Sequence, residues 1–381
     1  MDDVITTAEV ATTADITMLM LLIIAILPIT GIFLALIPYL VKKGEVFAVT
    51  VPESSVGDPF IKNLKRRYLL MTLGLTAVLT LISIIFLLAG NELGAVLSMG
   101  ISAVLICFGS FALMLFFRKK VRAYKTEQGW VAEHQERTAV VMGMAIPRPV
   151  SLAWHLLYLP IILATAAIGY HGFAAMPEII PLQVGFDGEI STEVAKTPLV
   201  IWLPVLIQVF LALCFVSSHW MITRSKWLSD PGAPAASALA YGMFAHAQSL
   251  YLVAGGLVLG AAMVMMPLTF MGVLSLMQAA VLLLLAAFLL LIGAIVISLV
   301  YGQGGARVFK RMQESNVLLA DEDAHWKLGI FYFNRDDPNL FLPARFGIGW
   351  TCNFARPFVW VLIVALVAVT TAFVVSMLML T

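Results

Sequence analysis

The sequence predicts an all-α polytopic membrane protein with about eight transmembrane helices and a small cytoplasmic hairpin-like element before the last helix. This class is predicted by the composition of the chain and by the recurrence of long apolar runs. Of the 381 residues, 61% are hydrophobic and only 12% are charged, and the mean hydropathy is +0.98. Apolar runs of about 20 residues, long enough to cross a bilayer, recur along the whole chain. The formal net charge is only +1, so no nucleic-acid partner is expected.

Each apolar run is bounded by polar residues and predicts one span. The runs cover residues 16–40, 68–89, 95–117, 151–170, 198–222, 239–266, 271–301 and 357–380. The first run is expected to be a retained helix and not a secretory signal, because acidic residues and no basic ones precede it. Asp58 and Pro59 predict a helix start, since Asp caps helices and Pro suits the first helical position.

The distribution of basic residues predicts the orientation. Lys196 is the only one of the 23 Lys and Arg residues that does not lie in or beside the loops after the first, third, fifth and seventh runs. The positive-inside rule places those loops in the cytoplasm and both termini outside. We therefore expect a multi-pass protein of a bacterial plasma membrane with lipids among its partners. The basic cluster at residues 62–67 serves as a topology signal in this interpretation, and attraction of anionic lipid is the alternative.

The same pattern divides the chain into five parts. They are an N-terminal three-helix unit with basic cytoplasmic loops (1–150), a two-helix unit (151–222) with a structured outer loop (171–197), the sixth and seventh helices (223–301), a cytoplasmic interfacial segment (302–356) and the last helix (357–381).

The interfacial segment is predicted to form a hairpin. The aromatic stretches "GIFYFN" and "NLFLPARFG" flank "RDDP", whose Asp and Pro favour a turn. Aromatic rings are favoured at the level of lipid headgroups, so we expect this hairpin to lie against the membrane or to bind a partner. The candidate docking residues are Trp326, Tyr332, Asn334, Asp337, Phe341, Trp350 and Asn353.

The spans carry few groups suited to chemistry. No Asp, Glu, Lys or Arg falls clearly within a span, which argues against ion-coupled transport. His155, His219 and His246 lie at similar depth in three consecutive spans, and three imidazoles with an open position would suit a transition metal. No carboxylate accompanies them at a recognisable spacing, so interfacial histidines that bond carbonyls or water are the preferred interpretation. We expect no cofactor, and no motif indicates an enzyme.

The outer loop "MPEIIPLQVGFDGEISTEVAKTP" is similar to the outer-loop signature of a bacterial membrane family that includes the SdpI-type immunity proteins against secreted killing factors. The matching residues are Pro177, Pro181, Asp187, Gly188, Glu189 and Lys196. Gln183 stands where that family has His, and its amide keeps both a hydrogen-bond donor and an acceptor. The resemblance implies that Gln183, Asp187, Glu189 and Lys196 bind a ligand.

The stretch "HWKLGIFYFNRDDPNLFLPARFGIGWTCNFARP" resembles a short uncharacterised cytoplasmic domain of multi-span proteins that carry that outer loop, and "IPYLVKKGEVFAVTVPES" is similar to the same group. Together they imply a binding protein related to peptide-toxin immunity or envelope sensing. Its partners would be a secreted peptide outside and a soluble regulator or membrane-complex subunit inside. A transporter or flippase for a neutral or amphipathic solute is the first alternative, and a membrane-embedded metal enzyme at the three histidines is the second. The transporter would need a polar cavity among Gln208, Tyr241, Gln248 and Gln278.

Overall fold

The computed structural model describes residues 13–41, 44–52, 55, 57–130, 146–184, 190–226, 233–312, 323–347 and 349–380. Within these residues, eight helical segments are long and apolar enough to cross a membrane, which confirms the predicted fold class. The segments are Thr17–Leu40, Pro59–Leu88, Leu93–Glu127, Leu152–Ala175, Pro198–Thr223, Pro234–Phe270, Leu276–Met312 and Pro357–Val375. Each contains or overlaps one predicted span.

The first three helices pack into one unit, which we call the first unit. They are α1 (Thr13–Leu40), α2 (Pro59–Leu88) and α3 (Glu92–Glu127). The predicted helix start is confirmed, because the Asp58 carboxylate accepts a 2.7 Å hydrogen bond from the Phe60 amide. Helices α1 and α2 approach closely at Gly31, where an added Cβ would lie 2.1 Å from the Thr76 hydroxyl. Only Gly allows the two helices to come this near.

The remaining spans form the second unit. Its helices are η2 (Leu152–Leu157), α4 (Tyr158–Gly172), η3 (Phe173–Ala175), η4 (Pro198–Ile201), α5 (Trp202–Thr223), α6 (Pro234–Met263), α7 (Met265–Phe270), α8 (Leu276–Tyr301), η5 (Gln303–Gly305), α9 (Ala306–Met312) and α10 (Pro357–Leu380). Helix α8 starts at a capping box between Ser275 and Gln278 and packs against both α6 and α1, so it joins the two units. Helix α10 packs on α5, where Phe210 and Phe373 stack at 4.5 Å.

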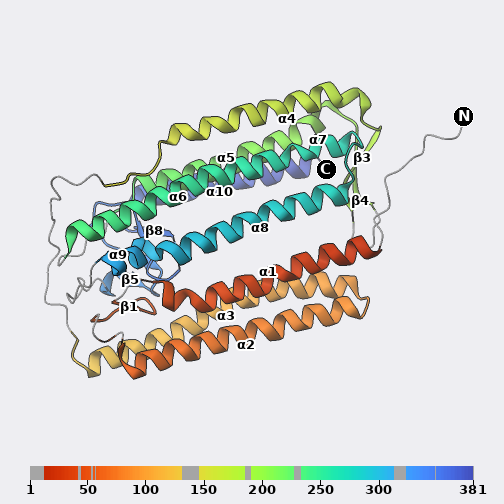
Figure 1. Cartoon of the computed structure of the whole chain (residues 1–381). Coiled ribbons are helices and arrows are strands. Elements are labelled where there is room, and N and C mark those ends of the chain that lie inside the picture. Colours follow the sequence, from red (N-terminus) through yellow and green to blue (C-terminus); the bar gives the residue numbers. More distant parts are fainter. Residues whose placement is uncertain are drawn as a thin grey trace, which may run out of the picture.

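Short antiparallel strand pairs occupy the two ends of the helix bundle (Figure 1). The pairs are β1 (Glu45–Val46) with β2 (Val49–Thr50), β3 (Ile179–Val184) with β4 (Ile190–Ala195), β5 (Trp326–Lys327) with β6 (Phe331–Tyr332), and β7 (Phe341–Pro343) with β8 (Trp350–Cys352). The β3–β4 hairpin lies at one end, which we call the hairpin end. The other end carries β1–β2 and a segment that runs from η6 (Asp323–His325) to residue 356. We call this segment, residues 323–356, the cap.

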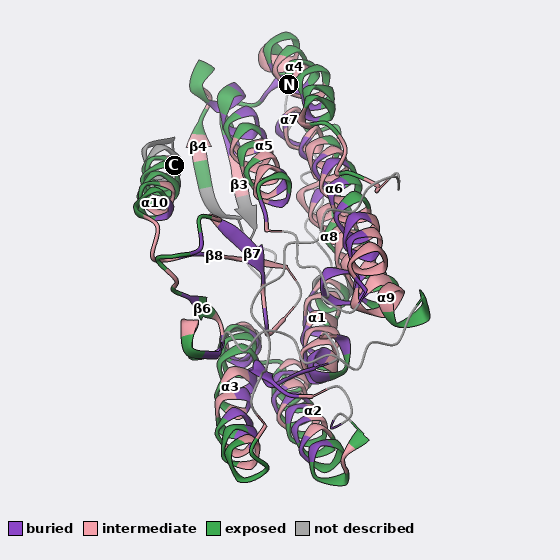
Figure 2. Cartoon of the chain, turned by 90° about the vertical axis from the view of Figure 1, so that its left-hand side faces the viewer, coloured by how far each residue is buried: buried purple, intermediate pink, exposed green. Residues whose placement is uncertain are grey.

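The outer surfaces of the helices carry many exposed apolar side chains. Figure 2 shows the outward faces of α2, α3, α4 and α10 largely as exposed surface, and the purple of buried residues is prominent in β7. Phe108, Leu163 and Val364 are each two-thirds exposed in the isolated chain. Apolar area of this extent is unfavourable in water and favourable in lipid. The chain is therefore a multi-pass membrane protein.

The cap differs from the predicted hairpin in its strand pairing. The prediction placed one turn at residues 335–338, between two aromatic strands, but each aromatic stretch contributes one strand to a separate hairpin, β5–β6 or β7–β8. The chain reverses at Leu328 and Gly329, whose φ values are 51° and 77°. A bridge between Tyr332 and Asn353 then joins the two hairpins. Residues 335–338 form no hairpin turn because Asp337 turns inward and binds several cap groups, as described below.

Candidate functional site

A buried carboxylate, Asp323, fixes the cap to the first unit. Its Oδ1 accepts hydrogen bonds from the amide of Thr50 at 3.1 Å and from the hydroxyl of Thr50 at 2.9 Å. Its Oδ2 accepts one from the ammonium group of Lys125, at the end of α3, at 2.8 Å. Arg345 in the β7–β8 loop donates from Nη1 to Oδ1 and also lies 3.9 Å from Glu45. One side chain thus connects four chain segments.

The charge of Asp323 is held in its ionised form. Burial alone would raise the pKa of the carboxyl group, but the positive charges of Arg345 and Lys125 and the Thr50 amide together hold this pKa below its usual range. Only 10% of the Asp323 side chain is exposed. A buried carboxylate without these partners would be strongly destabilising, so the cap position depends on the whole set.

The β1–β2 hairpin meets the cap through a strained turn. Phe47 and Ala48 have φ values of 48° and 58°, a conformation that non-Gly residues rarely adopt. Two contacts compensate: the Phe47 ring is buried and lies 5.3 Å from the stacked ring of Phe117, and Arg118 donates a 2.6 Å hydrogen bond to the Ala48 carbonyl. Arg118 also donates to the Trp326 carbonyl of the cap at 3.2 Å. The strained turn is therefore part of the joint between the first unit and the cap.

A second buried carboxylate, Asp337, organises the inside of the cap and contacts the second unit. Its Oδ2 accepts hydrogen bonds from the Tyr332 hydroxyl at 3.0 Å and from Lys226, just beyond α5, at 3.1 Å. Its Oδ1 accepts from the amide and side chain of Asn339. Burial would raise the pKa of Asp337, but the Asn339 hydrogen bonds and the Lys226 charge lower it overall.

The second unit binds the cap at three further places. The Lys226 amide donates to the Phe341 carbonyl at 2.8 Å, so β7 is bridged to the end of α5. The Gln303 side chain in η5 accepts from the Gly349 amide and donates to carbonyls of the β7–β8 loop at 2.7 and 2.9 Å. Trp350 stacks on Phe244 of α6 at 5.3 Å. The cap is therefore held by both helical units.

The residues predicted to dock a membrane or partner mostly serve this internal network. Trp326, Tyr332, Phe341 and Asp337 are buried, and Asn353 is fully buried. The Asn353 amide donates to the carbonyls of Asn334 and Asp337 and thereby closes the cap. Trp350 and Asn334 are partly exposed. In this conformation the buried members contact the protein's own elements and offer no surface to a partner.

The β3–β4 hairpin is fixed to the second unit. Lys196 donates to the carbonyls of Met176 at 2.7 Å and Ala174 at 3.3 Å, and its ammonium lies 5.3 Å from the centre of the Phe173 ring. Lys196 therefore anchors the hairpin base. Gln183 pairs with Thr192 in the strands. Of the other predicted ligand-binding residues, Asp187 and Glu189 lie outside the described residues.

The three histidines do not converge. His155 Nε2 lies 2.8 Å from His219 Nδ1, and both rings are buried. His246 is exposed and bonds the Arg148 carbonyl instead. The described part of the chain contains no group of three His, Cys, Asp or Glu side chains able to hold a metal. The second alternative of the sequence analysis therefore has no three-histidine cluster in this conformation, because His246 lies on an exposed face of α6 and bonds a carbonyl.

The His pair has unused hydrogen-bonding capacity. His155 Nδ1 and His219 Nε2 are buried and have no hydrogen-bond partner among the described residues. In either tautomer, one of these two nitrogens is a donor and the other an acceptor.

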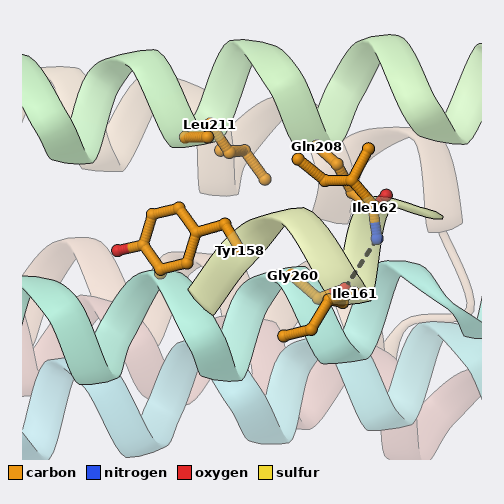
Figure 3. A pocket seen from close by; sticks show the side chains of 8 residues that line it. Tyr158, Ile161, Ile162, Gln208, Leu211 and Gly260 are labelled. Atoms are coloured by element: carbon orange, nitrogen blue, oxygen red, sulfur yellow. Dashed lines mark hydrogen bonds between the residues drawn. The ribbon is translucent and has the colours of Figure 1, made fainter. Parts of the chain in front are cut away.

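A small pocket lies between α4, α5 and α6 (Figure 3). Tyr158, Gln208 and Gly260 are among its lining residues, and the free space accommodates about one water molecule. The Gln208 amide donates to the Gly260 carbonyl at 2.8 Å and to the Thr165 hydroxyl at 2.7 Å. Its Oε1 is buried and has no partner among the residues described.

The polar cavity expected of a transporter is not formed by the four residues proposed for it. Gln208 lines the pocket, but Tyr241 accepts a hydrogen bond from the Trp350 indole in the cap. Gln278 caps α8 at the hairpin end, and Gln248 lies outside the pocket lining. Tyr241 and Gln278 instead have hydrogen-bond partners near their own helices.

Sequence reasoning missed the residues that hold the cap most firmly, namely Asp323, Arg345, Lys226, Arg118 and Gln303. Asp323 pairs with Thr50 across 273 positions and with Lys125 across 198. No local pattern signals such pairs. The excess of charged residues in the two resembling stretches was the available sign, since a cap that buries carboxylates needs cations from elsewhere.

Comparison with known proteins gives one match. Residues 335–360 match the model of a family of unknown function, DUF5808. This agrees with the resemblance of the cap to an uncharacterised domain, and the matched segment contains Asp337, Arg345 and Asn353 of the cap network. No curated protein and no solved structure matches the chain. The cap residues from Arg335 onward and the start of α10 are thus similar to a segment found in other proteins, whose role is not known.

Proposed function

We propose that this chain is an integral membrane binding protein that receives a ligand at the β3–β4 hairpin and transmits its presence to the cap. The resemblance of the outer loop to the SdpI-type signature favours a secreted, membrane-active peptide as the ligand. The cap would then bind a soluble regulator or a subunit of a membrane complex. The cap end faces the cytoplasm in this proposal, because its loops hold nearly all basic residues.

Helix α5 is the observation that carries this proposal. It follows directly on the β3–β4 hairpin through Lys196 and η4, and it ends at Thr223, shortly before Ser225 and Lys226, which are bonded to the cap. A displacement of the hairpin therefore acts on the cap through one continuous helix. Rigid elements that contact both sites are the physical means by which coupling travels.

The pocket at Gln208 favours a binding protein over a carrier. With room for about one water molecule, it holds no solute in this conformation. A carrier would need this region to open widely, and α4, α5 and α6 are joined across it by hydrogen bonds from Gln208 and from Tyr158, whose hydroxyl donates to the Leu252 carbonyl at 3.1 Å.

The test uses sensitive bacteria that express the protein. These bacteria are exposed to a panel of secreted cationic membrane-active peptides. We expect protection from killing and from membrane depolarisation by at least one peptide. The triple variant Asp187→Ala, Glu189→Ala, Lys196→Ala should lose this protection while still inserting into the membrane. Because Lys196 anchors the hairpin base, the double variant Asp187→Ala, Glu189→Ala is the matched control that keeps the anchor. Full protection in both variants would contradict a ligand site on this hairpin.

A further inference from the structure

Lys65 of α2 is a half-buried cation that pairs with no carboxylate of the described residues. Its side chain is only partly exposed, and no acidic side chain of the described residues forms an ion pair with it. Its ammonium lies 5.9 Å from the centre of the Tyr39 ring in the last turn of α1. A cation–π contact stabilises the charge only modestly. Among the described residues, Lys65 therefore has no anionic partner of the kind that a half-buried ammonium group ordinarily has.

The neighbours of Lys65 increase the demand for an anion. Lys62 lies one turn before Lys65 on the same face of α2, Arg66 follows Lys65 directly in the helix, and both are exposed. Arg66 is within electrostatic reach of the Tyr39 phenol, which is itself 44% exposed. The described acidic groups of the adjoining loop are used elsewhere: Glu45 lies 3.9 Å from Arg345, and Asp58 caps α2 and accepts a 2.8 Å hydrogen bond from Tyr124.

The position of this cluster matches the edge of the bilayer. Tyr39 lies at the end of the α1 span, and the long apolar part of α2 begins at Tyr68. Headgroup phosphates are found at this level, where a phenol ring is also favoured. Basic groups between helices at such a position are a recognised means of holding anionic headgroups.

We propose that Lys65, with Tyr39, Arg66 and Lys62 around it, binds the phosphate group of an anionic phospholipid beside the ends of α1 and α2. Lys65 contacts the phosphate, and the exposed cations strengthen the attraction. The acyl chains then lie along the exposed apolar face of α2, which includes Leu70 at 55% and Met71 at 49% exposure. A free phosphate ion shares the headgroup chemistry but lacks these acyl chains.

The experiment compares two neutral variants of the full chain in nanodiscs of phosphatidylcholine that contain a small fraction of phosphatidylglycerol. Lys65→Met removes the half-buried cation, and Lys62→Met removes an exposed cation from the same helix face. Retained phosphatidylglycerol is measured by native mass spectrometry. We expect about tenfold weaker retention for Lys65→Met, the size of one lost charge-assisted hydrogen bond, and less than a threefold change for Lys62→Met.

Equal, small effects of the two variants would overturn the proposal and indicate diffuse attraction to the membrane surface. Displacement of the lipid by millimolar inorganic phosphate would also overturn it, because a free anion would then be the ligand. Lys65→Arg keeps the positive charge and should retain the lipid within about threefold of the native chain. If Lys65→Met does not fold, the Lys65→Arg variant and the phosphate competition still decide the question. Loss of the lipid from a folded Lys65→Arg protein would contradict an anion site.

Discussion

At the residue scale, the position of the cap depends on Asp323. Because its folded-state pKa lies below the usual carboxyl value, ionisation of Asp323 stabilises the cap fully above about pH 4 and less as the pH falls through the folded-state pKa. The pKa of Asp337 is also lowered, so its ionisation likewise stabilises the cap less as the pH falls. We expect protection of residues 45–52 and 323–332 against hydrogen exchange, corrected for intrinsic rates, to fall on acidification below this pH.

The variant Asp323→Asn should lower the stability of the cap by about 3 kcal/mol at neutral pH, because Lys125 and Arg345 then lose their buried anion. The variant should also weaken the dependence of this hydrogen-exchange protection on acid pH. Hydrogen exchange at neutral pH checks the first effect. A variant that keeps native protection would show that the ion pairs are not what holds the cap.

The strained turn of the β1–β2 hairpin gives a prediction with opposite signs at adjacent positions. Ala48→Gly should raise the unfolding free energy by about 1 kcal/mol, because Gly adopts a positive φ without strain. Phe47→Gly relieves the same strain but removes a buried ring, and should lower stability by about 3 kcal/mol. Thermal unfolding in detergent measures both. A stabilising Phe47→Gly would contradict the packing role of the ring.

Single residues were the hardest feature to predict from the sequence. Asp58 and Pro59 were recognised as a helix start because both signals are local. Asp323, Lys226 and Gln303 were not recognised, because their partners are remote in sequence and any polar residue can find a remote partner. The aromatic residues of the cap were recognised as structured, but the rings of Trp326, Tyr332 and Phe341 are buried within the protein.

At the element scale, the link between α5 and the cap is the part most open to test. Lys226→Met removes the ion pair with Asp337 and should lower cap stability by about 3 kcal/mol, because Asp337 stays buried. Arg335→Gln is the control, since Arg335 is an exposed cation in the same segment. Limited proteolysis of residues 323–356 should become faster for the first variant only. Equal rates would contradict a tight α5–cap contact.

The packing of α4 on α6 gives a second prediction at this scale. A Cβ at Gly256 would lie 2.0 Å from the Tyr158 hydroxyl, whereas one at Gly260 would lie 3.8 Å from Ile161. Gly256→Ala should therefore destabilise the protein by about 1–3 kcal/mol, and Gly260→Ala should be nearly neutral. Melting temperatures of the two variants in one detergent make the comparison. The same sensitivity at both positions would show that this helix interface differs from the one described.

Elements were predicted well where hydrophobic length decided them. All eight spans were found, because a bilayer imposes a minimum apolar length that is visible in the sequence. The two hairpins of the cap were predicted as one. Asp and Pro at residues 335–338 do favour a turn. The Asp337 carboxylate, however, accepts hydrogen bonds from Tyr332, Asn339 and Lys226, and no hairpin forms there.

At the scale of the whole molecule, two helical units share one cap. Asp323 connects the cap to the first unit, and Lys226, Gln303 and Trp350 connect it to the second. Any relative movement of the units must therefore move the cap or break these bonds. In the proposed function, the energy for such a movement comes from ligand binding at the β3–β4 hairpin, which is fixed to the second unit.

Cys352 in β8 is a native reporter of the cap. Burial raises the pKa of its thiol, so the reactive thiolate is scarce at neutral pH and labelling is slow. Replacing Cys107 and Cys214 by Ala leaves Cys352 as the only thiol in the chain. A looser cap should increase its reactivity.

The most direct test is the labelling rate of Cys352 by a maleimide in nanodiscs, with and without each cationic peptide that binds the protein. The account predicts that a peptide bound at the β3–β4 hairpin changes this rate several-fold, and that Lys226→Met abolishes the change while the peptide still binds. An unchanged rate with every bound peptide would contradict coupling between the hairpin and the cap.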